Sequence, residues 1–157
     1  MNPLGDNWVA KLRTLPAVLG ILTIPVMYGT NRLAFSRIAG LMAAVVMAVS
    51  PFAVYLSQEA RHYTLPMVLI SLSLWILLQI QKDIFHRKKL NIGVWLAWVG
   101  VHTISLYVHY FCILALIPVT GTLVLIMWWY RQKIFQPIRV WLGLILANLG
   151  IAIAFLP

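Results

Sequence analysis

The stretch SQEARHYTL, Ser57 to Leu65, combines the side chains best suited to chemistry in this sequence. It holds Glu59, the only glutamate, followed by Arg61, His62 and Tyr63. A guanidinium can bind phosphate through paired hydrogen bonds, and a nearby carboxylate can orient it, bind a metal or accept a proton. The stretch therefore indicates anion recognition. The simpler alternative is an interfacial turn with a snorkelling arginine and a tyrosine of the aromatic belt.

A second polar cluster, HTISLYVHYF, contains His102, Tyr107, His109 and Tyr110. His102 and His109 are seven residues apart, so a continuous helix would place them on one face. Two histidines without a third suitably spaced ligand do not make a metal site. We expect His102 to form a hydrogen bond between helices, while site and interface roles are equally open for His109. The sequence contains no phosphate-binding glycine loop, nucleophile elbow or HExxH motif.

The elements that position these clusters must be membrane helices. The chain has 157 residues, of which 62% are hydrophobic and 10% charged, whereas a soluble domain needs a more charged surface. Runs of about 18 apolar residues are long enough to cross a bilayer. These runs are apolar on all sides, as in lipid-buried helices, and do not alternate as barrel strands do. We therefore predict an all-α integral membrane protein, a polytopic bundle of about six transmembrane helices.

The six predicted spans are residues 15–33, 38–56, 62–81, two that share 91–130, and 138–156. Residues 91–130 are too many for one span, and we divide them near LYVHYF, residues 106–111. Pro51 is expected to kink the second span, and Pro66 to lie in the first turn of the third. The segment before residue 15 is too polar to span, so we expect it to lie along the interface.

Basic residues predict the orientation of the spans. Of the 12 lysines and arginines, nine follow odd-numbered spans: Arg32, Arg37, Lys82, Arg87, Lys88, Lys89, Arg131, Lys133 and Arg139. Basic loops favour the cytoplasm, so both polar clusters and both chain ends are predicted to face the periplasm, cell exterior or an organelle lumen. The net charge of +9 is spread between apolar runs, which argues against a nucleic-acid partner because such a footprint gathers on one soluble face.

Aromatic residues and the single cysteine have structural interpretations. Tryptophans in NIGVWLAWVG and IMWWY are predicted anchors at the cytoplasmic interface, namely Trp95, Trp98, Trp128 and Trp129. HRKK is a predicted topology determinant that also attracts anionic lipid. Cys112 has no second cysteine to pair with and is predicted to be a small buried residue.

The polar clusters also carry a family resemblance. Residues 11–80, with the LR–P–VLG entry to a helix and the motif SPFAVYLSQEARHYTL, resemble the N-terminal part of glycosyltransferase family 39. That family includes dolichyl-phosphate-mannose–protein mannosyltransferases and bacterial lipid-A aminoarabinose transferases. A later LYVHYF is similar to the family's LYTHYF type of motif, so the resemblance covers most of the chain.

The resemblance implies part of a GT-C membrane fold and an inverting glycosyltransferase. Such an enzyme transfers a sugar from a polyprenyl-phosphate donor to a lipid, glycan or protein acceptor outside the cytoplasm. The implied donor-phosphate and substrate residues are Arg61, Glu59, His62, Tyr63, His109, Tyr110 and Arg13. The resemblance fixes no cofactor and allows a divalent metal, for which we assign no ligand. It implies a multi-pass protein of the bacterial inner membrane, with its active side towards the periplasm or cell exterior.

The sequence departs from the family pattern at the catalytic acid. The family's acid lies in an outer loop after a helix that precedes this chain's start, and Asp6 lies too close to the LR–P entry to match it. We therefore expect residues 1–157 to be one transmembrane domain, a fragment of a larger GT-C domain, that is inactive alone and leaves the catalytic base unassigned. The alternative is a non-catalytic polytopic membrane protein, either a lipid-binding partner or a transporter-like bundle, in which SQEARHYTL only anchors a turn.

Overall fold

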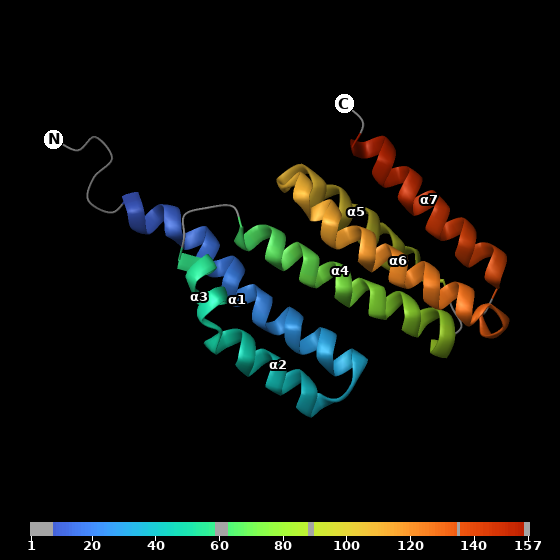
Figure 1. The fold of residues 1–157 in the computed structure, drawn as a ribbon, viewed down its shortest axis with the longest axis horizontal. Helices are drawn as coiled ribbons and strands as arrows, with labels where there is room; N and C mark the ends of the chain where they lie inside the picture. Colours follow the sequence, from blue (N-terminus) through green and yellow to red (C-terminus); the bar gives the residue numbers. More distant parts are fainter. Residues whose placement is uncertain (1–7, 59–62, 88–89, 135, 156–157) are drawn as a thin grey trace. The chain divides into compact units, whose positions relative to one another are not determined.

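The computed structural model describes residues 8–58, 63–87, 90–134 and 136–155. The α-helices in these ranges are α1 (Trp8–Ala34), α2 (Arg37–Val49), α3 (Pro51–Gln58), α4 (Thr64–Lys82), α5 (Ile92–Val108), α6 (Ile113–Trp129) and α7 (Pro137–Phe155). Figure 1 shows them along the chain. A π-helical turn, η1 (Asp83–Arg87), continues α4, and the 3-10 turns η2 (Tyr110–Cys112) and η3 (Arg131–Lys133) flank α6. The described residues form no strand, which confirms the all-α prediction.

Several of these helices are long and apolar enough to cross a membrane. Four stretches qualify singly: Leu12–Ala34, Thr64–Arg87, Tyr110–Trp129 and Pro137–Phe155. The bent pair α2 and α3 makes a fifth if it counts as one span. Helix α5 is shorter, with 17 residues, or about 26 Å at the usual helical rise. The described residues thus support four or up to five spans of a multi-pass membrane protein, and a sixth stays a prediction.

The start of the first span differs from the prediction. We expected an interfacial segment before residue 15, but one continuous helix of 27 residues begins at Trp8. Lys11, Leu12 and Arg13 are good helix formers, and the helix continues through them into the apolar run. The structure therefore joins Arg13 rigidly to the first span.

Pro51 interrupts the second predicted span, as expected. Helix α2 ends at Val49, Ser50 is extended with φ −64° and ψ 117°, and α3 begins at Pro51. The angle between the two helices is 54°. The proline ring disfavours the helical conformation in the preceding residue but suits the first position of a new helix. The bend redirects the chain just before SQEARHYTL.

The chain divides into two compact units, Met1–Ser71 and Leu72–Pro157. In the first unit, α1 packs against α2 and α3 (Figure 1). The α1–α2 approach depends on Gly40, because a Cβ there would lie 2.8 Å from the Tyr28 carbonyl oxygen and 3.1 Å from the Arg32 Cβ. Helices approach this closely in membranes where small residues lie between them.

Replacing Gly40 with alanine is expected to destabilise the α1–α2 pair. Alanine favours a helix over glycine by about 1 kcal/mol, but overpacking against a backbone oxygen costs about 1–3 kcal/mol, so the clash outweighs the propensity. Denaturation in detergent, followed by circular dichroism, should show a lower midpoint. Gly100→Ala is the matched control, since a Cβ there meets nothing within 4 Å; a midpoint for Gly40→Ala at or above that of this control would contradict the packing.

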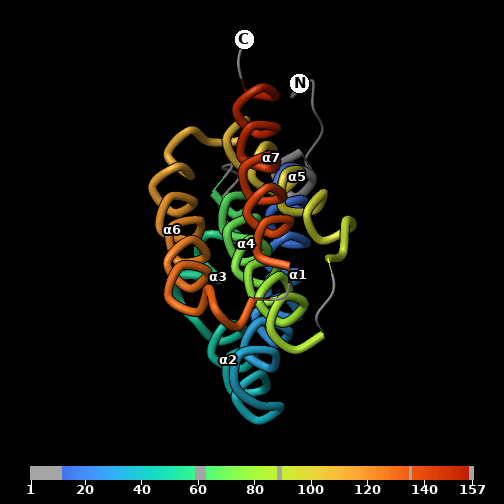
Figure 2. The backbone as a smooth tube through the Cα atoms, turned by 90° about the vertical axis from the view of Figure 1, so that its right-hand side faces the viewer, coloured from blue at the N-terminus to red at the C-terminus, as the bar shows by residue number. Residues whose placement is uncertain are grey.

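The second unit has a buried apolar core. Figure 2 shows α7 running beside α5 in this unit. Trp98, Leu123, Met127 and Val140, from α5, α6 and α7, are each 0% exposed. Cys112 is buried as predicted. The prediction that Trp98 is an interface anchor is wrong, because its side chain is buried in the core of this unit.

Candidate functional site

The candidate site begins where α3 ends and α4 starts. Glu59, Arg61 and His62 lie outside the residues that the structure describes. Tyr63 is described and is 40% exposed. The structure therefore defines the two helix ends that carry the SQEARHYTL stretch, and the roles of its three central ionisable residues stay predictions.

A partly buried hydrogen bond joins these two helix ends. Thr64 is 1% exposed, and its hydroxyl donates to the Leu56 carbonyl oxygen at 2.8 Å. This contact ties the first residue of α4 to the last turn of α3. Pro66 lies in the first turn of α4 as predicted. Backbone N–H groups in the first turn have no acceptor within the helix, so the missing N–H of proline costs no hydrogen bond there. The Thr64–Leu56 hydrogen bond thus holds the end of α3 and the start of α4 together.

Arg13 lies towards the same end of the first unit as this connection. Gly40 of α2 faces Tyr28 of α1, whereas Ser57 of α3 faces Gly20, so the chain moves back along α1 towards its N-terminus. Arg13 lies seven residues before Gly20, about 10 Å along the helix axis, and is exposed. The fold therefore brings Arg13 and Tyr63 to one end of this unit.

His109 and Tyr110 mark a break between two helices of the second unit. Helix α5 ends at Val108, His109 is extended with φ −159° and ψ 111°, and η2 begins at Tyr110. The Nδ1 atom of His109 accepts a hydrogen bond from the Phe111 N–H at 3.3 Å. The His109 and Tyr110 rings stack with centroids 5.7 Å apart, and Tyr110 is 64% exposed. The predicted division of 91–130 near LYVHYF is confirmed.

His102 does not share a helical face with His109, because α5 ends before His109. His102 is buried, and its Nδ1 lies 3.0 Å from the Trp98 carbonyl oxygen of its own helix. Its ring stacks on Trp98 with centroids 4.1 Å apart. The Nε2 atom has no hydrogen-bond partner among the described residues. Among the described residues, the hydrogen bond of His102 therefore lies within α5 and not between helices.

Sequence reasoning missed an ion pair at the end of α4. Arg87 donates from Nη1 to the Asp83 Oδ1 at 2.9 Å, and Asp83 is 3% exposed. Their spacing of four residues on a helix was the available signal. The pair gives one oxygen of the buried carboxylate a charged partner, while Oδ2 has no hydrogen-bond partner among the described residues.

The described residues contain no group of three histidine, cysteine, aspartate or glutamate side chains that could hold a metal ion. Arg13 and Tyr63 belong to the first unit, and His109 and Tyr110 to the second. Within each unit the two predicted residues lie near a helix end. These positions suit groups that reach the membrane–water boundary, where charged and phenolic side chains are tolerated.

Residues 4–156 match the family model described as dolichyl-phosphate-mannose-protein mannosyltransferase. No curated protein and no solved structure matches the chain. The matched range includes both polar clusters and almost the whole sequence, so this multi-pass membrane chain belongs to the dolichyl-phosphate-mannose-protein mannosyltransferase family of membrane glycosyltransferases.

Proposed function

We propose that this chain contributes about six spans to the GT-C membrane fold of an inverting glycosyltransferase. The enzyme takes a sugar from a polyprenyl-phosphate donor and transfers it to a lipid, glycan or protein acceptor on the outer face of a bacterial inner membrane. The family match over residues 4–156 is the observation that carries this proposal. In this proposal residues 1–157 belong to a single transmembrane domain, as part of the larger GT-C membrane domain.

Arg61 recognises the donor phosphate in this proposal. When the glycosidic bond breaks, the electron pair stays with the polyprenyl phosphate, and negative charge grows on its oxygen atoms. A guanidinium placed there stabilises that charge more in the transition state than in the ground state. Glu59 orients the guanidinium, and His62 and Tyr63 complete the phosphate site.

The described parts of the first unit support this arrangement. The hydrogen bond between Thr64 and Leu56 holds together the two helix ends that flank Arg61 in the sequence. Arg13 lies towards the same end of the unit and adds a second positive charge, which suits a diester or monoester phosphate. These contacts fix the helix ends that flank residues 59–62 in the sequence.

His109 and Tyr110 bind substrate in this proposal. Tyr110 is exposed and His109 is held at the α5–η2 break, so both offer polar atoms at a helix end for the sugar or acceptor. The general base that activates the acceptor is not among the residues we assign. A divalent metal is compatible with donor phosphate, and we assign it no ligands.

The alternative is a non-catalytic lipid-binding partner or a transporter-like bundle, which would bind membrane lipid but transfer no sugar. This alternative and the proposed glycosyltransferase differ in one measurable property, the transfer of sugar from a lipid-linked donor. The purified protein, expressed from its gene in full and reconstituted in vesicles, is expected to transfer labelled sugar from polyprenyl phosphate. An absence of transfer with every lipid-linked sugar offered would favour the non-catalytic alternative.

A further inference from the structure

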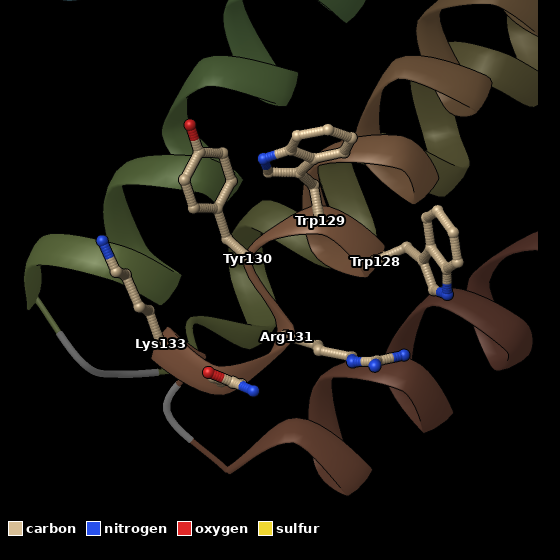
Figure 3. Close-up of a pocket in the computed structure, with 6 residues that line it drawn as sticks. Trp128, Trp129, Tyr130, Arg131 and Lys133 are labelled. Atoms are coloured by element: carbon tan, nitrogen blue, oxygen red, sulfur yellow. The ribbon is translucent and has the colours of Figure 1, made fainter.

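The turn that follows α6 gathers aromatic and basic side chains around one cavity. Its volume is about 360 Å³, and it is lined by Trp128, Trp129, Tyr130, Arg131, Gln132 and Lys133 (Figure 3). All six residues are exposed, and none is acidic. Two cations therefore share a small cavity that contains no carboxylate to neutralise them.

Arg131 differs from the other arginines of the second unit in its contacts. Arg87 is paired with Asp83, and Arg139 donates to the Gln136 Oε1 at 3.0 Å. Among the described residues, the Arg131 guanidinium has neither a hydrogen bond nor an ion pair. Its donors are available to a ligand, and a guanidinium presents them in the fork that suits phosphate oxygens.

The position of the cavity along the membrane helices indicates the ligand. One candidate span ends at Trp129 and the next begins at Pro137, so the turn between them lies where two spans meet the boundary of the bilayer. Exposed tryptophan and tyrosine prefer the headgroup region, and nearby arginine and lysine attract anionic lipid. The available anion at this depth is a phospholipid headgroup.

We propose that this corner, residues 128–133, binds the phosphate headgroup of an anionic membrane phospholipid. Figure 3 shows the Arg131 side chain extending towards the side of Trp128, while Lys133 extends towards Tyr130. The Lys133 Nζ lies 5.8 Å from the centre of the Tyr130 ring, a cation–π distance. Arg131 contacts the phosphate directly, and Lys133, held over Tyr130, supplies a second positive charge.

This lipid site is independent of the proposed glycosyl transfer. It uses none of the residues assigned to the donor phosphate, and on the predicted orientation it faces the cytoplasm. The donor site is predicted on the opposite face. Failure of the lipid-binding test would therefore not contradict the proposed glycosyl transfer. Failure of the transfer assay would likewise not contradict the lipid site.

Native mass spectrometry of the chain in phosphatidylcholine nanodiscs with added phosphatidylglycerol tests the proposal. The wild-type chain is expected to retain phosphatidylglycerol over phosphatidylcholine. Arg131→Gln with Lys133→Gln should weaken that retention roughly 30-fold, since each basic residue near an anionic surface contributes about 1 kcal/mol. Circular dichroism should show unchanged helix content, because both side chains are exposed.

The matched control removes the same charge elsewhere. Arg37→Gln with Lys82→Gln eliminates two exposed basic side chains that do not line the cavity, and phosphatidylglycerol retention should stay close to wild type. An equal loss in both double variants would show a general surface-charge effect and overturn the site. Binding of inorganic phosphate as strong as that of phosphatidylglycerol would overturn the assignment to lipid.

Discussion

Arg61→Ala is expected to reduce the turnover of the membrane enzyme about 100- to 1,000-fold, the usual cost of removing a group that stabilises transition-state charge. The loss follows from leaving the departing phosphate without its guanidinium. Arg61→Lys should give an intermediate rate, because an ammonium keeps the charge but loses the paired donors. The measurement is transfer of labelled sugar from a polyprenyl-phosphate donor, with the amount of inserted protein determined in parallel.

Arg37→Ala is the control for this change. Arg37 is exposed at the first residue of α2, and its loss removes one basic residue without touching the proposed donor site. Its turnover should remain near that of the wild-type enzyme. Near-normal turnover by an Arg61→Ala variant that inserts normally would contradict a role for Arg61 in donor-phosphate recognition.

Gly20→Ala is expected to lower both stability and turnover, because it forces α1 and α3 apart. A Cβ at Gly20 would lie 2.6 Å from the Ser57 Cβ, which is too close for two non-bonded carbon atoms. The overpacking cost is about 1–3 kcal/mol, and it falls on the helix that leads into SQEARHYTL. Denaturation midpoints in detergent and the same transfer assay measure the two effects.

A compensating change makes the Gly20 prediction specific. Ser57→Gly removes the Cβ that clashes, so the double variant should recover stability relative to Gly20→Ala, with a coupling energy of at least about 1 kcal/mol. Ser57→Gly alone should cost about 0.5–1 kcal/mol because glycine weakens a helix. Gly121→Ala serves as the matched control, since a Cβ there meets nothing within 4 Å. Simple addition of the two single effects would show that Gly20 and Ser57 do not meet.

Local backbone chemistry explains which parts of the fold could be predicted. Pro51 keeps the backbone of Ser50 out of the helical conformation and suits the start of α3. Two adjacent residues therefore determine the bend. The break at His109 was predictable because polar residues interrupt a run too long for one span. In both cases the cause and the effect lie within a few residues of each other.

Contacts between distant residues explain what the sequence could not predict. Trp98 belongs to a buried core cluster that includes residues of other helices, such as Met127 and Val140, whereas tryptophan near a span end usually favours the interface. The approach of Gly20 to Ser57 likewise joins two helices whose register no local pattern reveals. The spacing of His102 and His109 predicted a shared face only if α5 continued, and it ends at Val108.

The predicted site depends on two kinds of information. Arg13, Tyr63, His109 and Tyr110 came from motif resemblance, and the structure places each near a helix end. Spacing alone would not have selected Arg13, which lies more than 40 residues before the SQEARHYTL stretch. The antiparallel course of α1 and α3 is what brings Arg13 towards that stretch.

The donor preference of the purified enzyme tests the central claim most directly. The protein, expressed from its gene in full, is reconstituted in sealed vesicles and supplied with the same labelled sugar on polyprenyl phosphate or on a nucleotide. We predict transfer from the polyprenyl-phosphate donor only, with the opposite anomeric configuration in the product. Transfer from the nucleotide donor with none from polyprenyl phosphate would contradict the account.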